Sequence, residues 1–176
     1  MCKAQAIMNG GDFLNKAEVY KFLEENAIEY KAYEHQAVFT VEEADALNLP
    51  DPEADTKNLF LRDQKKQNYY LLTARAHLPV RIKEYQKKIG AKNLSFASEE
   101  DLIRILGVIK GSVTPFGLFN DEDKSVKFYL DDYFQNREIS GHPNENTATV
   151  FLQANDLMKL LEANGNPVSW ISLDEE

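Results

Sequence analysis

The chain has 176 residues, of which 43% are hydrophobic and 28% are charged. This length and composition predict a single globular domain that buries its own core, and they exclude fibrous and wholly disordered classes. No apolar run approaches the ~18 residues of a membrane span, and no apolar segment near the N-terminus has the pattern of a secretory signal. Cys2 is the single cysteine, which excludes an internal disulfide framework. We therefore expect a cytoplasmic protein without a membrane partner.

The net charge of -9 is distributed unevenly along the chain. Residues 57–92 hold ten Lys and Arg against two Asp and Glu, a local charge of +8, whereas the remainder holds 10 against 27, or -17. A basic segment of this kind can attract phosphate locally while the rest of the protein repels polyanions. A solvated helix face over 81–92 would give the same pattern, so charge alone does not choose between the two interpretations.

The N-terminal part of the sequence predicts a tail, a helix and a strand. Residues 1–12 are small, polar and glycine-containing, and we expect a flexible tail that precedes one domain over 13–176. Apolar residues recur at helical spacing over 15–26, and alternate with charged ones over 28–34. The pattern Thr40-Val41-Glu42-Glu43 predicts a capping box that begins a short helix.

The central part predicts a β-hairpin followed by mixed helices and strands. Two apolar runs, 57–63 and 68–74, flank a polar loop, and a helix opens at Pro79 and ends before Gly90. Further strands are expected over 94–97, 125–130, 137–139, 147–153 and 167–171, and further helices from Ser98 to Gly107 and over 155–163. This order predicts an α+β fold, a single domain with a mixed, largely antiparallel sheet surrounded by helices.

Common catalytic and cofactor motifs are missing from the sequence. It has no Walker phosphate loop, no dinucleotide-binding turn, no His-Glu-x-x-His pattern and no Gly-x-Ser-x-Gly elbow. The three histidines are too scattered to predict a metal centre, so we expect neither a metal nor a cofactor. Cys2 lies in the expected tail, where a nucleophile could not be held against a base.

Three segments place unusual residues between apolar elements. Lys57 and Asn58 begin an apolar strand, where a cation can face a ligand, although most lysines are simply exposed. The loop Gly111–Pro115 can bring backbone N–H groups close to an anion, although such clusters are usually structural turns. His142 lies between Gly141 and Pro143 in a loop, where the alternative to a functional role is a satisfied surface histidine.

These segments, taken in order, resemble the prolyl-tRNA editing family, the freestanding relatives of the editing insertion in bacterial prolyl-tRNA synthetases. The resemblance is carried by four motifs: Tyr33–Ala44, Lys57-Asn58-Leu59-Phe60-Leu61-Arg62, Gly111-x-x-x-Pro115 and Gly141-His142-Pro143. It extends from about Asn15 to Ile171. Gly-His-Pro followed by Asn-Glu-Asn is most similar to the branch that deacylates alanyl-tRNA(Pro).

The resemblance implies that the protein hydrolyses the ester between a misactivated amino acid and the terminal adenosine of tRNA. It places Lys57 against the 3′-terminal nucleotide, the Gly111 backbone against the substrate carbonyl, and His142 beside the amino-acid pocket. Asn58 and Thr40 are further candidates for the pocket wall, and Ser112 and Pro115 belong to the loop that bounds it. Water is the implied nucleophile. A small pocket would exclude proline by size, as a second sieve.

Two other functions stay open at this level. The same scaffold could act on cysteinyl or seryl esters, as it does in sister branches of the family. Alternatively, the chain could be a non-catalytic module that binds aminoacyl-tRNA or a synthetase, since the acidic flanks could dock a basic partner. The expected partners are the acceptor end of tRNA(Pro) and prolyl-tRNA synthetase. Oligomeric state does not follow from the sequence.

Overall fold

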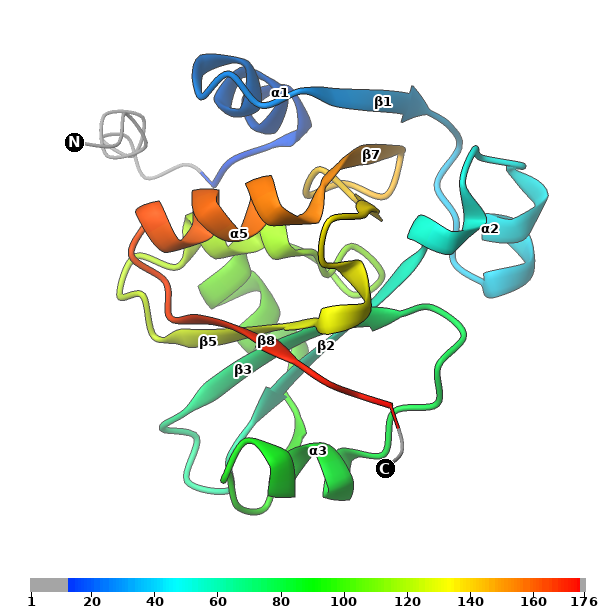
Figure 1. The fold of residues 1–176 in the computed structure, drawn as a ribbon. Coiled ribbons are helices and arrows are strands. Elements are labelled where there is room, and N and C mark those ends of the chain that lie inside the picture. The colour runs from blue at the N-terminus through cyan, green and yellow to red at the C-terminus, as the bar shows by residue number, and fades with distance from the viewer. Residues whose placement is uncertain (1–12, 175–176) are drawn as a thin grey trace.

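The computed structural model describes residues 13–174 and divides the strands between two sheets (Figure 1). The three-stranded sheet has the order β1 (Tyr30–Glu34), β7 (Ala148–Gln153), β6 (Glu138–Gly141). The five-stranded sheet has the order β4 (Ser95–Phe96), β2 (Thr56–Arg62), β3 (Tyr69–Arg75), β5 (Val126–Asp131), β8 (Val168–Ile171). Pairings β3–β5 and β5–β8 are parallel and all others are antiparallel. The expected α+β class with mixed, largely antiparallel pairing is confirmed. The expected tail, 1–12, lies outside the described residues.

Helices and short turns connect these strands. The α-helices are α1 (Lys16–Glu25), α2 (Val41–Ala46), α3 (Ile82–Lys88), α4 (Glu99–Asp101) and α5 (Ala154–Ala163). Shorter helical turns are the 3-10 turns η2 (Pro52–Ala54), η4 (Pro115–Asn120) and η5 (Asp132–Phe134), and the π turn η3 (Leu102–Leu106) that continues α4. Asn15, Thr40 and Ser98 each cap a helix through a complete capping box, which confirms the predicted starts.

Several predicted boundaries differ from the structure, and two of these differences bear on the candidate site. The helix predicted to open at Pro79 begins at Ile82, because Arg81 still has an extended backbone at the N-cap position. The loop predicted over Gly111–Pro115 ends at Thr114, because Pro115 already begins the turn η4, where proline suits the first position of a helical turn.

Apolar side chains form a core on each face of the five-stranded sheet. In Figure 1, α5 lies on one side of the five-stranded sheet and α3 on the other. The larger core lies between this sheet, α1, α5, η4 and the three-stranded sheet, and the smaller one includes Tyr85 of α3. Strand β2 contributes to both, because successive side chains of a strand point to opposite faces. Phe60 enters the larger core, whereas Leu59 and Leu61 enter the smaller one. By the same alternation, Lys57 lies on the face of α3 and Asn58 on the face of the larger core.

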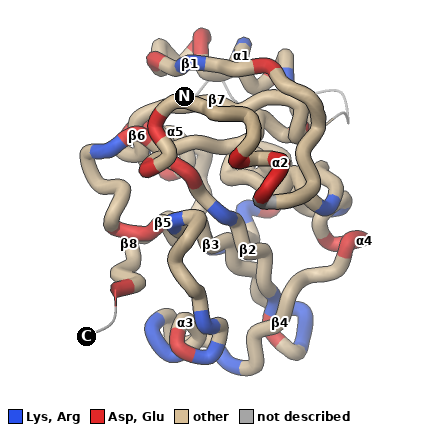
Figure 2. The backbone as a smooth tube through the Cα atoms, turned by 90° about the vertical axis from the view of Figure 1, so that its right-hand side faces the viewer, with Lys and Arg blue, Asp and Glu red and all other residues tan. Residues whose placement is uncertain are grey.

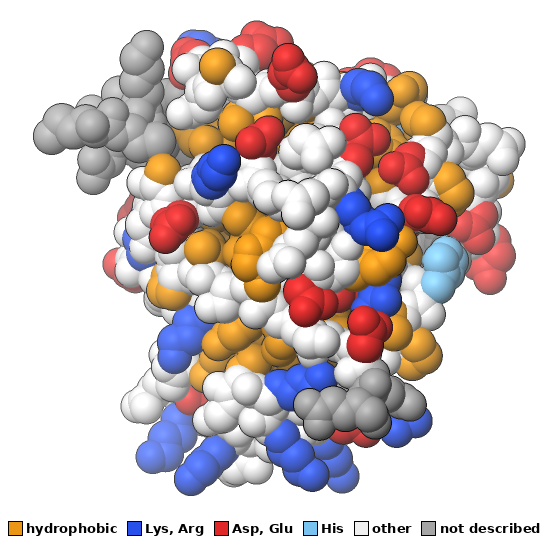
Figure 3. Space-filling model, viewed as in Figure 1, with side chains coloured by type: hydrophobic (Ala, Val, Ile, Leu, Met, Phe, Trp, Pro, Cys, Tyr) orange, Lys and Arg blue, Asp and Glu red, His pale blue; other side chains and the backbone are white. Residues whose placement is uncertain are grey.

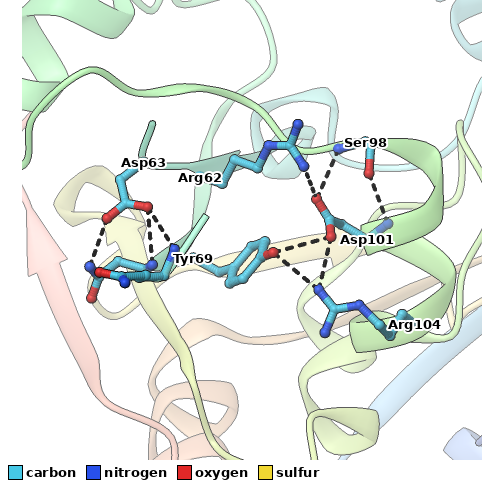
Figure 4. A network of polar contacts seen from close by, with 8 residues as sticks. Arg62, Asp63, Tyr69, Ser98, Asp101 and Arg104 are labelled. Carbon is cyan, nitrogen blue, oxygen red and sulfur yellow. Dashed lines mark hydrogen bonds and ion pairs between the residues drawn. The ribbon is translucent and has the colours of Figure 1, made fainter. Parts of the chain in front are cut away.

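A buried carboxylate ties the hairpin of β2 and β3 to α4 (Figure 4). The Asp101 carboxylate accepts hydrogen bonds from Arg62 Nη1 at 2.5 Å, Arg104 Nη2 at 2.8 Å and the Tyr69 hydroxyl at 3.1 Å. It also accepts the backbone N–H of Ser98 at 3.3 Å, as part of the capping box. The network therefore joins the end of one strand, the beginning of the next and the start of a helix.

Candidate functional site

The start of β2 lies against the strand that leads to His142. The Thr56 hydroxyl donates to the backbone oxygen of Ser140 at 2.8 Å, and a Cβ added at Gly141 would lie 3.7 Å from Thr114 Oγ1. The beginning of β2, the end of β6 and the loop before η4 therefore meet at one place, although they are far apart in the sequence.

The glycine loop also lies close to Asn146, in the loop after β6. Gly111 has φ +91°, a backbone conformation that glycine adopts readily, and an added Cβ would lie 3.9 Å from Asn146 Nδ2. The same amide nitrogen donates to the backbone oxygen of Val38 at 3.0 Å. Asn146 thus links the Gly111 loop, the loop after β6 and the segment between β1 and α2.

His142 carries a neutral imidazole with one nitrogen available. Its Nδ1 lies 3.0 Å from the backbone oxygen of Ala148, and because a carbonyl only accepts, Nδ1 carries the hydrogen. No described residue hydrogen-bonds to Nε2, whose lone pair is therefore available to a water or substrate group. Burial lowers the pKa of His142, and the nearby His35 lowers it further.

His35 is the site residue that the sequence analysis did not single out. Its ring centroid lies 6.3 Å from that of His142, and its nitrogens contact the backbone oxygen of Gln36 and Thr149 Oγ1, both at 2.8 Å. The carbonyl again identifies Nδ1 as the donor. The sequence feature that could have indicated His35 is its position just after an alternating strand. Its proximity to His142, however, depends on the pairing of β1 with β7.

Lys57 faces away from these loops. Its Nζ donates to the backbone oxygen of Leu78, in the segment after β3, and burial lowers the pKa of its ammonium group. No interaction in the described part of the chain joins its side chain to Gly111 or His142. The structure therefore brings the Gly111 and His142 loops together and places the Lys57 backbone beside them, with its side chain on the other face of β2.

The remaining predicted residues have structural partners within the fold. Asn58 Oδ1 accepts the Thr73 hydroxyl at 2.6 Å, and Thr40 Oγ1 accepts the N–H of Glu43 at 3.1 Å as a helix cap. Ser112 is only 2% exposed, and Pro115 is buried in η4. Their side chains shape the loops that meet at the site.

A cavity of about 400 Å³ lies next to Lys57. Its walls come from η2, the end of β3 with the loop that follows it, and η5: Pro52, Glu53, Asp55, Arg75, Ala76, His77, Leu78, Pro79 and Tyr133. None of the seven residues singled out from the sequence lines it. Leu78, however, lines the cavity, and its backbone oxygen accepts a hydrogen bond from Lys57. This lysine therefore lies behind one wall of the cavity.

Basic residues lie close together along the backbone at the end of the molecule that carries α3 (Figure 2), and Lys and Arg side chains gather at the same end of the surface (Figure 3). Five of them are exposed and have no ion pair or hydrogen bond in the described part of the chain: Lys65, Lys66, Lys83, Lys87 and Lys92. Arg62 and Arg75 of the same basic segment are instead paired with Asp101 and Asp131. The free lysines leave a local positive surface on an acidic protein.

Residues 13–174 contain neither a membrane-spanning helix nor a cluster of metal-binding side chains. No helix there is both long and apolar enough to cross a bilayer. No cluster of three or more His, Cys, Asp or Glu side chains in that range could hold a metal ion.

This fold and these motifs match known proteins over most of the chain. The family model of the aminoacyl-tRNA editing domain matches residues 35–160. The chain is 41% identical, over 90% of its length and 97% of the relative's, to the prolyl-tRNA editing protein ProX of Acetoanaerobium sticklandii. It is 35% identical, over 90% of its length and 96% of the relative's, to the mouse prolyl-tRNA synthetase associated domain-containing protein 1.

A solved structure described as a candidate trans-editing enzyme for prolyl tRNA synthetase superposes with a TM-score of 0.69. It shares 20% identity with this chain, and the match covers 94% of this chain and 100% of that one, which shows the common fold. The chain belongs to the aminoacyl-tRNA editing domain family.

Proposed function

We propose that this protein is a freestanding deacylase that hydrolyses mischarged alanyl-tRNA(Pro). The observation that carries the proposal is the meeting of the Gly111 and His142 loops, with the free Nε2 of a neutral His142 beside them. The names of the relatives, which specify prolyl-tRNA editing, support tRNA(Pro) as the substrate. The Gly-His-Pro motif favours alanine as the amino acid.

Hydrolysis of an aminoacyl ester requires the protein mainly to position the water and the ester. An aminoacyl ester is already activated, so holding a water in line and stabilising the tetrahedral oxyanion can supply most of the acceleration. His142 Nε2 is suited to accept a hydrogen bond from that water, and the exposed turn at Gly111 to offer backbone N–H groups to the oxyanion. No protein nucleophile is required.

The lysine surface would hold the RNA. Phosphates of the acceptor stem would lie along Lys83, Lys87 and the hairpin lysines, where cations are free of acidic partners. The name of the mouse relative supports prolyl-tRNA synthetase as a partner. We propose that the two proteins act together in the cytoplasm.

The function is tested by a deacylation panel. Purified protein is incubated with tRNA(Pro) charged with alanine, serine, cysteine or proline, and the remaining ester is followed with time. We expect alanyl-tRNA(Pro) to be hydrolysed fastest and prolyl-tRNA(Pro) to be spared, because an amino-acid pocket of the size of alanine would exclude proline. Faster loss of the seryl or cysteinyl ester would assign another specificity. Binding without any shortening of the ester half-life would indicate a non-catalytic module.

The pH dependence of deacylation should report the protonation of His142. Since burial lowers the pKa of this imidazole below its usual 6.5, the neutral form persists through neutral pH and is lost only as the pH falls below that value. We expect the rate, corrected for uncatalysed hydrolysis, to be flat near pH 7 and to decline only under more acidic conditions. His142→Gln should remove this acidic limb. An unchanged profile in the variant would contradict the assignment.

A further inference from the structure

Three residues follow Gly141-His142-Pro143 in the loop after β6, and the proposed chemistry does not use their side chains. Each of these side chains hydrogen-bonds to a backbone group more than 100 residues earlier in the chain. Asn144 Nδ2 donates to the Leu14 oxygen at 2.9 Å, Glu145 Oε2 accepts from the Lys16 nitrogen at 2.8 Å, and Asn146 Nδ2 donates to the Val38 oxygen at 3.0 Å. The loop that carries His142 is therefore anchored on distant segments of the chain.

Asn144 makes its hydrogen bond in a buried environment. Asn144 and its acceptor residue, Leu14, are each only 7% exposed. Loss of the amide would leave a buried carbonyl without a partner, which costs more than the bond itself contributes. The backbone of Asn144 is left-handed, with φ +63°, and its N–H donates to the His142 oxygen at 2.9 Å. The conformation of residue 144 and the position of His142 are thus fixed together.

The Leu14 peptide also reaches the turn that continues the Gly111 loop. Its N–H donates to Asn120 Oδ1 at 2.8 Å, and Asn120 is the last residue of η4, which begins at the end of this loop. Asn120 Nδ2 in turn donates at 2.8 Å to the backbone oxygen of Leu106, in the turn before the loop. The chain is therefore anchored on both sides of the Gly111 loop.

The packing of Phe13 supports the same connection. Phe13 lies against Gly107, which precedes the Gly111 loop: a Cβ added at Gly107 would lie 2.5 Å from a ring carbon of Phe13. Residues 13 and 14 thus contact the elements on either side of the Gly111 loop, and through Asn144 they contact the loop of His142. One short backbone segment holds both loops of the candidate site.

We propose that Asn144 is a positioning residue for the proposed deacylation: through the Leu14 peptide it holds His142 at a fixed distance from the Gly111 loop. The proposal rests on the proposed function for the reaction that His142 serves. Asn144 acts through the loop and not on the substrate, because its amide donates to Leu14. Placement matters for this chemistry, since an error of about 1 Å in the position of a catalytic group can cost about 100-fold in rate.

The test replaces Asn144 by glycine, which adopts a left-handed backbone without strain and lacks the amide. Deacylation of alanyl-tRNA(Pro) is measured under single-turnover conditions, at a temperature where the variant is fully folded. For Asn144→Gly we expect the rate at saturating enzyme to fall by about tenfold, because His142 is misplaced, while the enzyme concentration that gives half of that rate stays unchanged. A saturated rate equal to that of the wild type, with only a lower unfolding midpoint, would indicate a purely structural role and overturn the proposal.

A second measurement needs no RNA and does not depend on the proposed function. The nitrogen chemical shifts of an imidazole report which nitrogen carries the hydrogen. In the wild type Nδ1 of His142 carries it, because the Ala148 oxygen accepts at 3.0 Å. In Asn144→Gly the shifts should move toward those of mixed tautomers as the loop leaves Ala148, and shifts identical to the wild type would overturn the proposal. Loss of the proposed function is recognised separately, by a wild type that leaves alanyl-tRNA(Pro) intact.

The matched control is Asn136→Gly. Asn136 is exposed, has a left-handed backbone with φ +59°, and accepts one side-chain hydrogen bond from Asn155 Nδ2 at 2.9 Å. This variant should keep the wild-type rate and nitrogen shifts. If Asn144→Gly does not fold, Glu145→Ala replaces it, since Glu145 is exposed and its loss removes the hydrogen bond to Lys16. It should lower the saturated rate by roughly threefold, the weight of one modest hydrogen bond, and move the same nitrogen signals. No change in either quantity would overturn the proposal.

Discussion

Lys57→Ala is expected to lower the rate of alanyl-tRNA(Pro) deacylation by roughly 100-fold or more while the fold is retained. The family resemblance implies that this cation holds the 3′-terminal nucleotide, and loss of one preorganised charge typically has an effect of this size. The side chain has one hydrogen bond in the described structure, to the Leu78 carbonyl, so its removal should cost only about 1 kcal/mol of unfolding free energy. The rate is measured under single-turnover conditions, and the fold by thermal unfolding.

The matched control for this variant is Lys159→Ala, an exposed lysine of α5 that should leave both quantities unchanged. Raising the enzyme concentration to saturation separates two roles of Lys57. A defect that persists at saturation indicates that the cation positions the reacting ester, and one that disappears indicates binding of the 3′ nucleotide alone. Near-normal turnover in both regimes would contradict any role of Lys57 in the reaction.

Asp101→Ala is expected to have the largest effect on stability, a loss of about 3 kcal/mol. The carboxylate side chain is 8% exposed and accepts hydrogen bonds from two arginines and a tyrosine. Its removal leaves Arg62 without its ion-pair partner and removes one of the two hydrogen bonds of the α4 capping box (Figure 4). This loss lies at the lower end of the range for breaking a buried ion pair. The reason is that the Arg104 side chain is 57% exposed, so water can solvate its charge when Asp101 is removed. Urea unfolding at neutral pH measures the difference.

The same carboxylate makes stability depend on pH in a defined direction. Burial acts to raise the pKa of Asp101, but hydrogen bonds from Arg104, Ser98 and Arg62 hold it well below its usual range. The stabilisation is therefore fully present above the unfolded-state pKa of about 3.9 and is lost as the pH falls below it. The gap in unfolding free energy between wild type and Asp101→Asn should narrow under those conditions. The control Asp123→Asn, at an exposed position, should have the same unfolding free energy as the wild type at neutral pH. A difference between wild type and Asp101→Asn that does not change with pH would contradict the stabilising role of the Asp101 carboxylate.

The sequence by itself determined the local elements of this protein. The capping boxes at Asn15, Thr40 and Ser98 depend on residues three positions apart. The hairpin of β2 and β3 depends on two apolar runs joined by a short polar loop. These interactions are short in sequence, so the pattern contains all their partners. Its ordered motifs also pointed to the family without any knowledge of tertiary contacts.

Only the tertiary structure decided which loops meet and which way side chains face. The pairing of β1 with β7 and the parallel pairing of β3 with β5 each join segments more than 50 residues apart, which local patterns do not specify. Strand alternation then separates Lys57 from Asn58, although they are neighbours in the sequence. Long-range packing also brings His35 close to His142 and forms the cavity lined by Leu78. In both cases the residues come from elements that touch only in the folded chain.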